Sequence, residues 1–134
     1  MRRIGAHASL GIQWIVTGQP RRLVWLVDTR DALREFPPEV RTKLGFGVYL
    51  AQIGLKPETA KLLHGFDVPV WEVRADDRSG TYRVVYVVHL RNAVYALHAF
   101  QKKSKAGIAT PRRDVELIRQ RLKLARERDA KERG

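Results

Sequence analysis

The chain contains no cysteine and is poor in acidic residues, with 14 Asp and Glu against 26 Lys and Arg among 134 residues. Without cysteine it can form neither a disulfide framework nor a thiolate site for zinc or an iron–sulfur cluster. A long apolar run is also missing, because the N-terminal stretch 10–16 is interrupted by Gln13 and is too short to cross a bilayer. No convincing signal-peptide cleavage site follows it. We therefore expect a cytoplasmic protein without a membrane partner.

The length fits one domain, and an apolar fraction of 44% supplies a core for it. Charge is distributed unevenly: residues 1–27 carry +4, residues 28–100 carry +1 and residues 101–134 carry +7. We interpret residues 1–20 as a basic N-terminal extension and residues 21–134 as the folded domain. Basic ends around a nearly neutral middle favour a polyanionic partner, and a solvated face that keeps the protein soluble explains the charge equally well.

Hydrophobic patterning predicts an α+β fold. Apolar and β-forming runs indicate strands, the first buried on both faces and the other three joined by short turns into an antiparallel meander; they cover residues 23–27, 70–75, 81–88 and 93–100. Two helices are expected near the N-terminus, a short helix or turn over 28–36 and a longer helix from Pro38 to near Gly54, whose apolar stripe runs from Val40 to Leu55. Residues 56–63 form a polar, helix-prone stretch, and Thr110-Pro111 starts a C-terminal amphipathic helix with the threonine as its cap.

Sequence signatures of metal, phosphate-loop and serine-triad chemistry are absent. The four histidines are scattered, so we expect no metal and no cofactor. What remains is a set of basic side chains on neighbouring strands and just past the last one: Arg74, Arg83, His98, Lys102, Lys103 and Lys105. Such residues can stabilise the charge of a phosphodiester transition state and transfer protons without a metal.

Each candidate also has a structural explanation. Arg83 can equally form a cross-strand ion pair with Glu72. Strict alternation puts His98 on the face of Val94, Ala96 and Phe100, where a hydrogen-bonded core histidine is the more common outcome. The lysines after Phe100 can be ordinary loop charge. On the last helix, Arg119, Lys123 and Arg126 can contact RNA or simply face solvent.

The order of several short motifs resembles the RelE/ParE toxin superfamily, in particular its HigB-like, phage-derived Gp49-like branch. The resemblance spans about residues 22–126, and it is the ordered combination of motifs that is specific. The motifs are Leu63-His64-Gly65-Phe66, Trp71-Glu72-Val73-Arg74, Tyr82-Arg83-Val84-Val85-Tyr86, Leu97-His98-Ala99-Phe100-Gln101-Lys102-Lys103-Ser104 and Thr110-Pro111.

This resemblance implies a small four-stranded sheet packed with two N-terminal helices and a C-terminal helix. It further implies a toxin of a type II toxin–antitoxin pair, a ribosome-dependent endoribonuclease that cleaves mRNA in the A site. Its partners would be mRNA, the ribosome with its 16S rRNA, a helix-turn-helix antitoxin and, in some systems, an accessory chaperone.

By the same resemblance Arg83, His98, Lys102 and Lys103 are catalytic candidates. Arg74, Lys105, Arg119 and Lys123 are RNA-binding candidates. The alternative function is noncatalytic: nucleic-acid binding, or gyrase inhibition of the ParE type.

Overall fold

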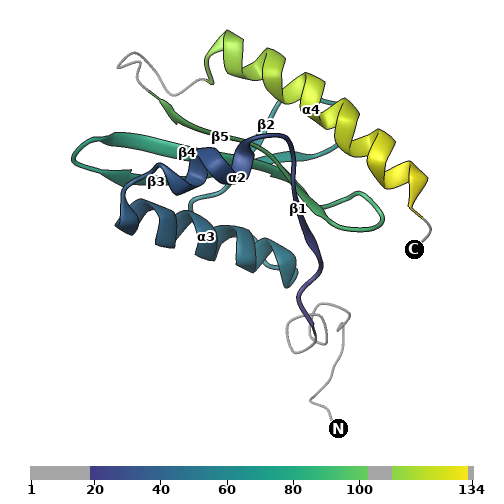
Figure 1. The fold of residues 1–134 in the computed structure, drawn as a ribbon, viewed down its shortest axis with the longest axis horizontal. Coiled ribbons are helices and arrows are strands. Elements are labelled where there is room, and N and C mark those ends of the chain that lie inside the picture. Colours follow the sequence, from purple (N-terminus) through teal and green to yellow (C-terminus); the bar gives the residue numbers. More distant parts are fainter. Residues whose placement is uncertain (1–18, 103–109, 133–134) are drawn as a thin grey trace, which may run out of the picture.

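The structure, a computed structural model, describes residues 19–102 and 110–132. In it a sheet lies between two helical layers, with α2 (Thr29–Arg34) and α3 (Pro38–Gln52) on one face and α4 (Arg112–Lys131) on the other (Figure 1). The strands are β1 (Leu23–Trp25), β2 (Lys61–Leu63), β3 (Val70–Asp77), β4 (Gly80–Val87) and β5 (Val94–Lys102). The predicted α+β class, with two helices before the main sheet and one after it, is confirmed.

The sheet has the order β1-β5-β4-β3-β2, so the described residues form five strands where four were predicted. The meander β3-β4-β5 is antiparallel as predicted, and β1 joins it parallel to β5. The additional strand is β2, which pairs antiparallel with β3 in a segment predicted to be helix-prone. Three residues are too few to display an alternating pattern, so this strand depends on pairing with β3 rather than on local preference.

The first strand is shorter than predicted. It ends at Trp25, and Val27, which we expected to be buried in a strand, is 67% exposed with a φ of 54°. The left-handed region is strained for a β-branched residue, and Val27 adopts it because the chain turns tightly here between β1 and α2. Thr29 stabilises the turn by donating its hydroxyl to the carbonyl oxygen of Leu26 at 2.7 Å.

The apolar stripe of α3 packs on one face of the sheet. Val40, Leu44, Val48 and Ala51 are buried there as predicted, whereas Leu55 is exposed because α3 ends at Gln52. Gly47 permits the close packing, since a Cβ atom at this position would lie 2.7 Å from a methyl group of Val73. A Cβ atom at Gly45 would meet nothing within 4 Å.

The opposite face is covered by α4, which buries Ile118, Leu122 and Ala125. The helix does not begin as predicted: Pro111 occupies the N-cap position, no side chain caps the helix, and the Thr110 hydroxyl binds a side chain of the sheet instead. Nowhere in the described residues is there a helix that combines the length and the apolar character needed to cross a membrane.

The pairing of β4 with β5 shifts by one residue near the middle of the strands. Val85 pairs with His98 but Tyr86 pairs with Ala96, so Leu97 is an extra residue in β5. Such a bulge reverses the alternation beyond it. His98 therefore lies on the α4 face with Phe100, and its predicted place beside Val94 and Ala96 is wrong, because those residues belong to the core under α3.

The two glycines of α3 provide a matched test of this packing. Gly45→Ala should raise the free energy of unfolding by up to about 1 kcal/mol, because alanine favours the helix and meets open space. Gly47→Ala gains the same propensity but crowds Val73, and overpacking costs about 1–3 kcal/mol, so a net loss is expected. Urea denaturation of both variants measures the difference. Equal stability of the two variants would contradict the close approach of α3 to β3.

Candidate functional site

A buried ion pair lies at the centre of the sheet face that α4 covers. Cross-strand pairing sets Arg74 opposite Arg83 and Glu72 opposite Val85, so Arg83 is the diagonal neighbour of Glu72. Nη1 of Arg83 donates to Oε1 of Glu72 at 2.6 Å, and the two side chains are only 2% and 1% exposed. The cross-strand ion pair considered from sequence is therefore formed. A buried carboxylate is stable only when it is paired, so this contact neutralises both groups.

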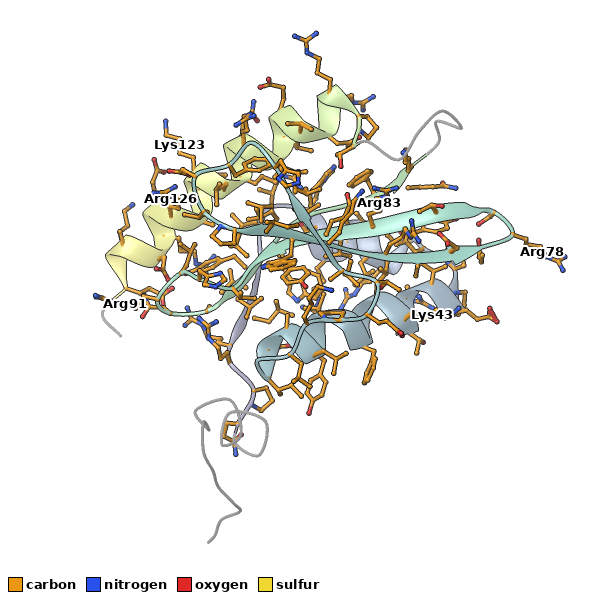
Figure 2. All side chains as sticks on the ribbon, turned by 180° about the vertical axis from the view of Figure 1, so that it is seen from behind. Lys43, Arg78, Arg83, Arg91, Lys123 and Arg126 are labelled. Atoms are coloured by element: carbon orange, nitrogen blue, oxygen red, sulfur yellow. The ribbon has the colours of Figure 1, made fainter. Side chains whose placement is uncertain are left out.

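Further groups surround the same carboxylate. Nζ of Lys61, from the neighbouring strand β2, lies 3.8 Å from Oε1, and the Thr110 hydroxyl donates to Oε2 at 3.1 Å. Glu72 thus joins two strands to the segment that leads into α4. In Figure 2 Arg83 lies on the side where α4 begins, whereas Lys123 and Arg126 lie farther along that helix.

Lys102 lies on the same sheet face as Arg83. It pairs with Thr81, two residues beyond the Phe100–Arg83 pair, and it is 7% exposed. Burial lowers the pKa of Lys102, the positive charges of Arg83 and Lys61 lower it further, and the Glu72 carboxylate opposes them. We call Lys61, Glu72, Arg83 and Lys102 the cationic cluster, since it combines three basic side chains with one acid. Arg83 and Lys102 therefore lie on the same side of the sheet.

This arrangement permits two kinds of chemistry. Guanidinium and ammonium groups gathered on one face can stabilise the charge of a phosphoryl group. A lysine with a lowered pKa releases and takes up a proton more readily near neutral pH than an ordinary lysine does. Within residues 19–102 and 110–132, no group of three histidine or acidic side chains has an arrangement that could hold a metal ion.

His98 is held on both sides of its ring. Nε2 lies 2.8 Å from Oδ1 of Asp114, and Nδ1 lies 3.4 Å from Nη1 of Arg121. Because arginine can only donate, Nδ1 accepts and Nε2–H donates to the carboxylate, which describes a neutral imidazole. Burial lowers the pKa of His98, although Asp114 opposes the shift. The ring also stacks on Phe100, with centroids 4.8 Å apart. These contacts fit the core-histidine explanation.

Arg121 is a buried residue that sequence reasoning missed. Its guanidinium donates to Leu97 O at 3.1 Å and to Oδ1 of Asp28 at 2.8 Å, which ties α4 to β5 and to the start of α2. The signal was present, because residue 121 follows Ile118 by three positions and so falls on the inner side of the helix. Asp114, which contacts His98, was likewise missed, because the sequence does not show which residues α4 packs against.

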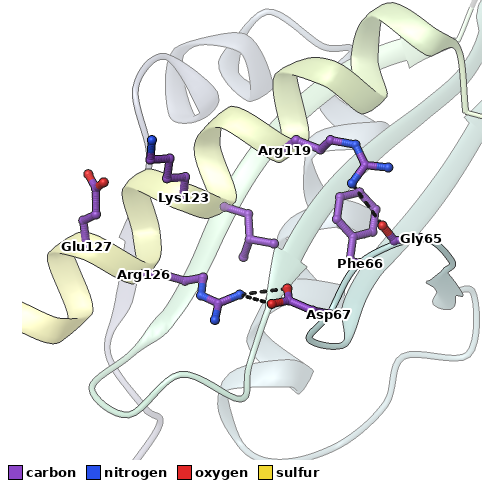
Figure 3. A pocket seen from close by; sticks show the side chains of 8 residues that line it. Gly65, Phe66, Asp67, Arg119, Lys123, Arg126 and Glu127 are labelled. Atoms are coloured by element: carbon purple, nitrogen blue, oxygen red, sulfur yellow. Dashed lines mark hydrogen bonds and ion pairs between the residues drawn. The ribbon is translucent and has the colours of Figure 1, made fainter.

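The other predicted site residues are dispersed. Arg74 is exposed although its register partner Arg83 is buried. Arg119 and Lys123 are exposed on α4 beside the loop that follows β2, where Arg119 donates to the carbonyl oxygen of Gly65 at 3.0 Å and lies over the Phe66 ring (Figure 3). Lys103 and Lys105 lie outside the described residues.

Comparison with known proteins agrees with this architecture. The family model described as "Phage derived protein Gp49-like (DUF891)" matches residues 31–123. The chain belongs to this Gp49-like family. The fold of this Gp49-like protein is similar to that of a free-state mutant of the E. coli toxin RelE that has two arginines replaced by alanine. The TM-score is 0.53 at 17% identity, and the match covers 79% of this chain and 98% of the RelE chain. A comparison with curated proteins gives no match.

The environment of His98 in the Gp49-like protein predicts a pH dependence of stability. A histidine whose folded pKa lies below its unfolded value of 6.5 binds protons more readily in the unfolded chain. The contribution of His98 to the free energy of unfolding is therefore full above pH 6.5 and decreases as the pH falls below that value. Asp114→Asn removes the group that raises the pKa, so it should move the NMR-detected titration of His98 to lower pH. His64→Gln, at an exposed histidine, should leave that titration unchanged. An upward shift in Asp114→Asn would contradict the assigned contacts.

Proposed function

We propose that this chain is the toxin of a type II toxin–antitoxin pair and that it cleaves mRNA in the ribosomal A site. The observation that carries the proposal is the convergence of Lys61, Arg83 and Lys102 on one sheet face, in a chain of the Gp49-like family with a RelE-like fold. The proposed partners are mRNA, the ribosome with its 16S rRNA, a helix-turn-helix antitoxin and an accessory chaperone. The proposed compartment is the cytoplasm.

In the proposed reaction the ribose 2′-hydroxyl attacks the adjacent phosphorus and the bond to the 5′-oxygen of the next nucleotide breaks. A base removes the 2′-hydroxyl proton, an acid returns a proton to the leaving oxygen, and a cation stabilises the negative charge that develops. We assign the charge stabilisation to Arg83 and one proton transfer to Lys102, whose pKa is lowered. His98 suits proton transfer less well, because both its ring nitrogens already have partners.

The remaining basic residues are assigned to RNA contacts. Arg74, Arg119 and Lys123 are exposed and can reach a phosphate backbone without rearrangement. Lys103 and Lys105 follow Lys102 directly in sequence, and we assign Lys103 to the catalytic group and Lys105 to RNA binding on that ground alone.

One observation favours the noncatalytic alternative. Arg83 is 2% exposed and already bound to Glu72, so it contacts a phosphate only if this ion pair rearranges. A protein that binds RNA through its exposed arginines and lysines needs no such rearrangement. Cleavage and binding must therefore be measured separately.

Substitutions of Lys102 make this separation. Lys102→Arg keeps the positive charge but abolishes proton exchange near neutral pH, so it should retain RNA binding and lower the cleavage rate on programmed ribosomes by about 100-fold, the usual loss for a missing proton-transfer group. Lys102→Ala should lower cleavage at least as much. Lys43→Ala, at an exposed lysine of α3, is the control and should cleave as the unaltered chain does.

Mapping of mRNA 5′ ends after expression provides the readout, with circular dichroism as the check on folding. Growth arrest without new 5′ ends, or full cleavage by Lys102→Arg, would contradict the nuclease proposal. Inhibition of DNA supercoiling by the purified protein would point to gyrase instead.

A further inference from the structure

A cavity lies on the sheet face opposite the cationic cluster. It has a volume of about 340 Å³ and opens between the C-terminal end of α3, strands β3 and β4, and the chain before β1. Trp71 and Tyr86, which pair across the strands and therefore point to the same face, form its aromatic wall, and Leu55 adds an apolar side. The helix α3 covers this face (Figure 1). By the strand register, Glu72 and Arg83 belong to the opposite face. The volume falls in the range of small-ligand sites, about 300–1,000 Å³.

The polar side chains around this cavity are basic. Arg21, Lys56 and His89 line it, and no acidic residue is among the described residues that do. Arg21 is held in place by three carbonyl oxygens, those of Val88 at 2.6 Å, Leu90 at 2.9 Å and Ala93 at 3.3 Å. These acceptors fix the guanidinium without cancelling its charge, because none of them is a carboxylate. Among the residues that the structure describes, Lys56 and His89 form no ion pair.

A tyrosine whose hydroxyl has no hydrogen-bond partner among the described residues also lines the cavity. Tyr86 is only 2% exposed, and its hydroxyl makes no hydrogen bond to any other described residue. Burial alone raises the pKa of this phenol, with no contribution from a hydrogen bond. A hydroxyl with no partner among the described residues is available to hydrogen-bond a ligand in the cavity. The half-buried indole of Trp71, directly opposite in the sheet, provides a flat apolar surface next to it.

From this combination we infer that the cavity binds a nucleotide, with its base against Trp71, a polar group of the base or ribose on the Tyr86 hydroxyl, and its phosphate between Lys56, His89 and Arg21. Aromatic side chains stack on nucleobases of any sequence, and basic side chains bind the phosphate. The ligand is either a free mononucleotide or one nucleotide of a single-stranded RNA, since both present the same chemistry. The site lies on the other side of the sheet from the cationic cluster and does not depend on the proposed cleavage.

The test measures binding to the full chain by isothermal titration calorimetry, with 5′-AMP, adenosine, inorganic phosphate and an eight-nucleotide oligo(A) RNA as probes. We expect 5′-AMP to bind more tightly than adenosine or phosphate alone. Lys56→Glu reverses an exposed charge at the rim and should weaken 5′-AMP binding by about tenfold or more. Tyr86→Phe removes only the hydroxyl and should weaken it by about three- to tenfold. Lys43→Glu, at an exposed lysine of α3 that does not line this cavity, is the matched control and should leave the affinity unchanged.

The RNA arm distinguishes the two sources of ligand. If oligo(A) binds more tightly than 5′-AMP and Lys56→Glu abolishes this tighter binding, the ligand is an RNA strand. If 5′-AMP binds but oligo(A) does not bind more tightly, the ligand is a free mononucleotide. The inference is overturned if phosphate binds as tightly as 5′-AMP, or if neither Lys56→Glu nor Tyr86→Phe weakens 5′-AMP binding. Lys102→Ala should abolish cleavage and leave 5′-AMP binding intact, so failure of either proposal is recognised independently of the other.

Discussion

The α4 face of the sheet depends on the neutralisation of one buried carboxylate. Glu72 lies in the middle of β3 with 1% exposure, and an isolated charge there would be far too costly to bury. Arg83 compensates it from the next strand, Lys61 from the strand on the other side, and Thr110 from the approach to α4. The acid also allows basic residues to gather on this face, because Arg83, Lys61 and Lys102 would otherwise repel one another without compensation. The same contact that stabilises the fold therefore assembles the candidate site.

The two helical layers pack on the sheet through different kinds of interaction. α3 packs through a continuous apolar stripe, and Gly47 brings it close enough to touch β3 directly. α4 buries three apolar residues but also two charged ones, Arg121 and Asp129. Asp129 accepts hydrogen bonds from the backbone amides of Arg91 and Asn92 and from the hydroxyl of Tyr95, whose pKa burial raises to about 12. The attachment of α4 is therefore partly polar, whereas that of α3 is apolar.

Sequence reasoning captured what depends on local pattern. The meander, the inner stripe of α3 and the inner stripe of α4 follow from period and turn residues, and the structure agrees with each. Three of the failures involve tertiary contacts. β2 exists because β3 offers it a pairing edge, and the hydroxyl of Thr110 binds Glu72 rather than capping a helix. His98 lies on the face opposite to the predicted one because a single extra residue, Leu97, reverses the alternation in β5. The hydrophobic pattern of the sequence gives no sign of this bulge.

The candidate site was predictable in its residue types but not in its environment. The sequence placed Arg83 on one strand and Lys102 just past the end of the next. The burial of these two side chains and the approach of Lys61 became visible only in the folded sheet. The same reasoning bears on the net charge of +12. Several acids of the described chain are engaged with basic partners: Asp28 with Arg121, Asp67 with Arg126, Glu72 with Arg83 and Glu132 with Arg22. The chain has 14 acidic and 26 basic residues. Each ion pair uses one of the few acids, so the net positive charge resides on the basic residues that have no acidic partner. A surface of that kind attracts polyanions, and the two faces of the sheet then offer them different chemistry: an acid-compensated cluster that can exchange a proton under α4, and an aromatic cavity with a basic rim beside α3.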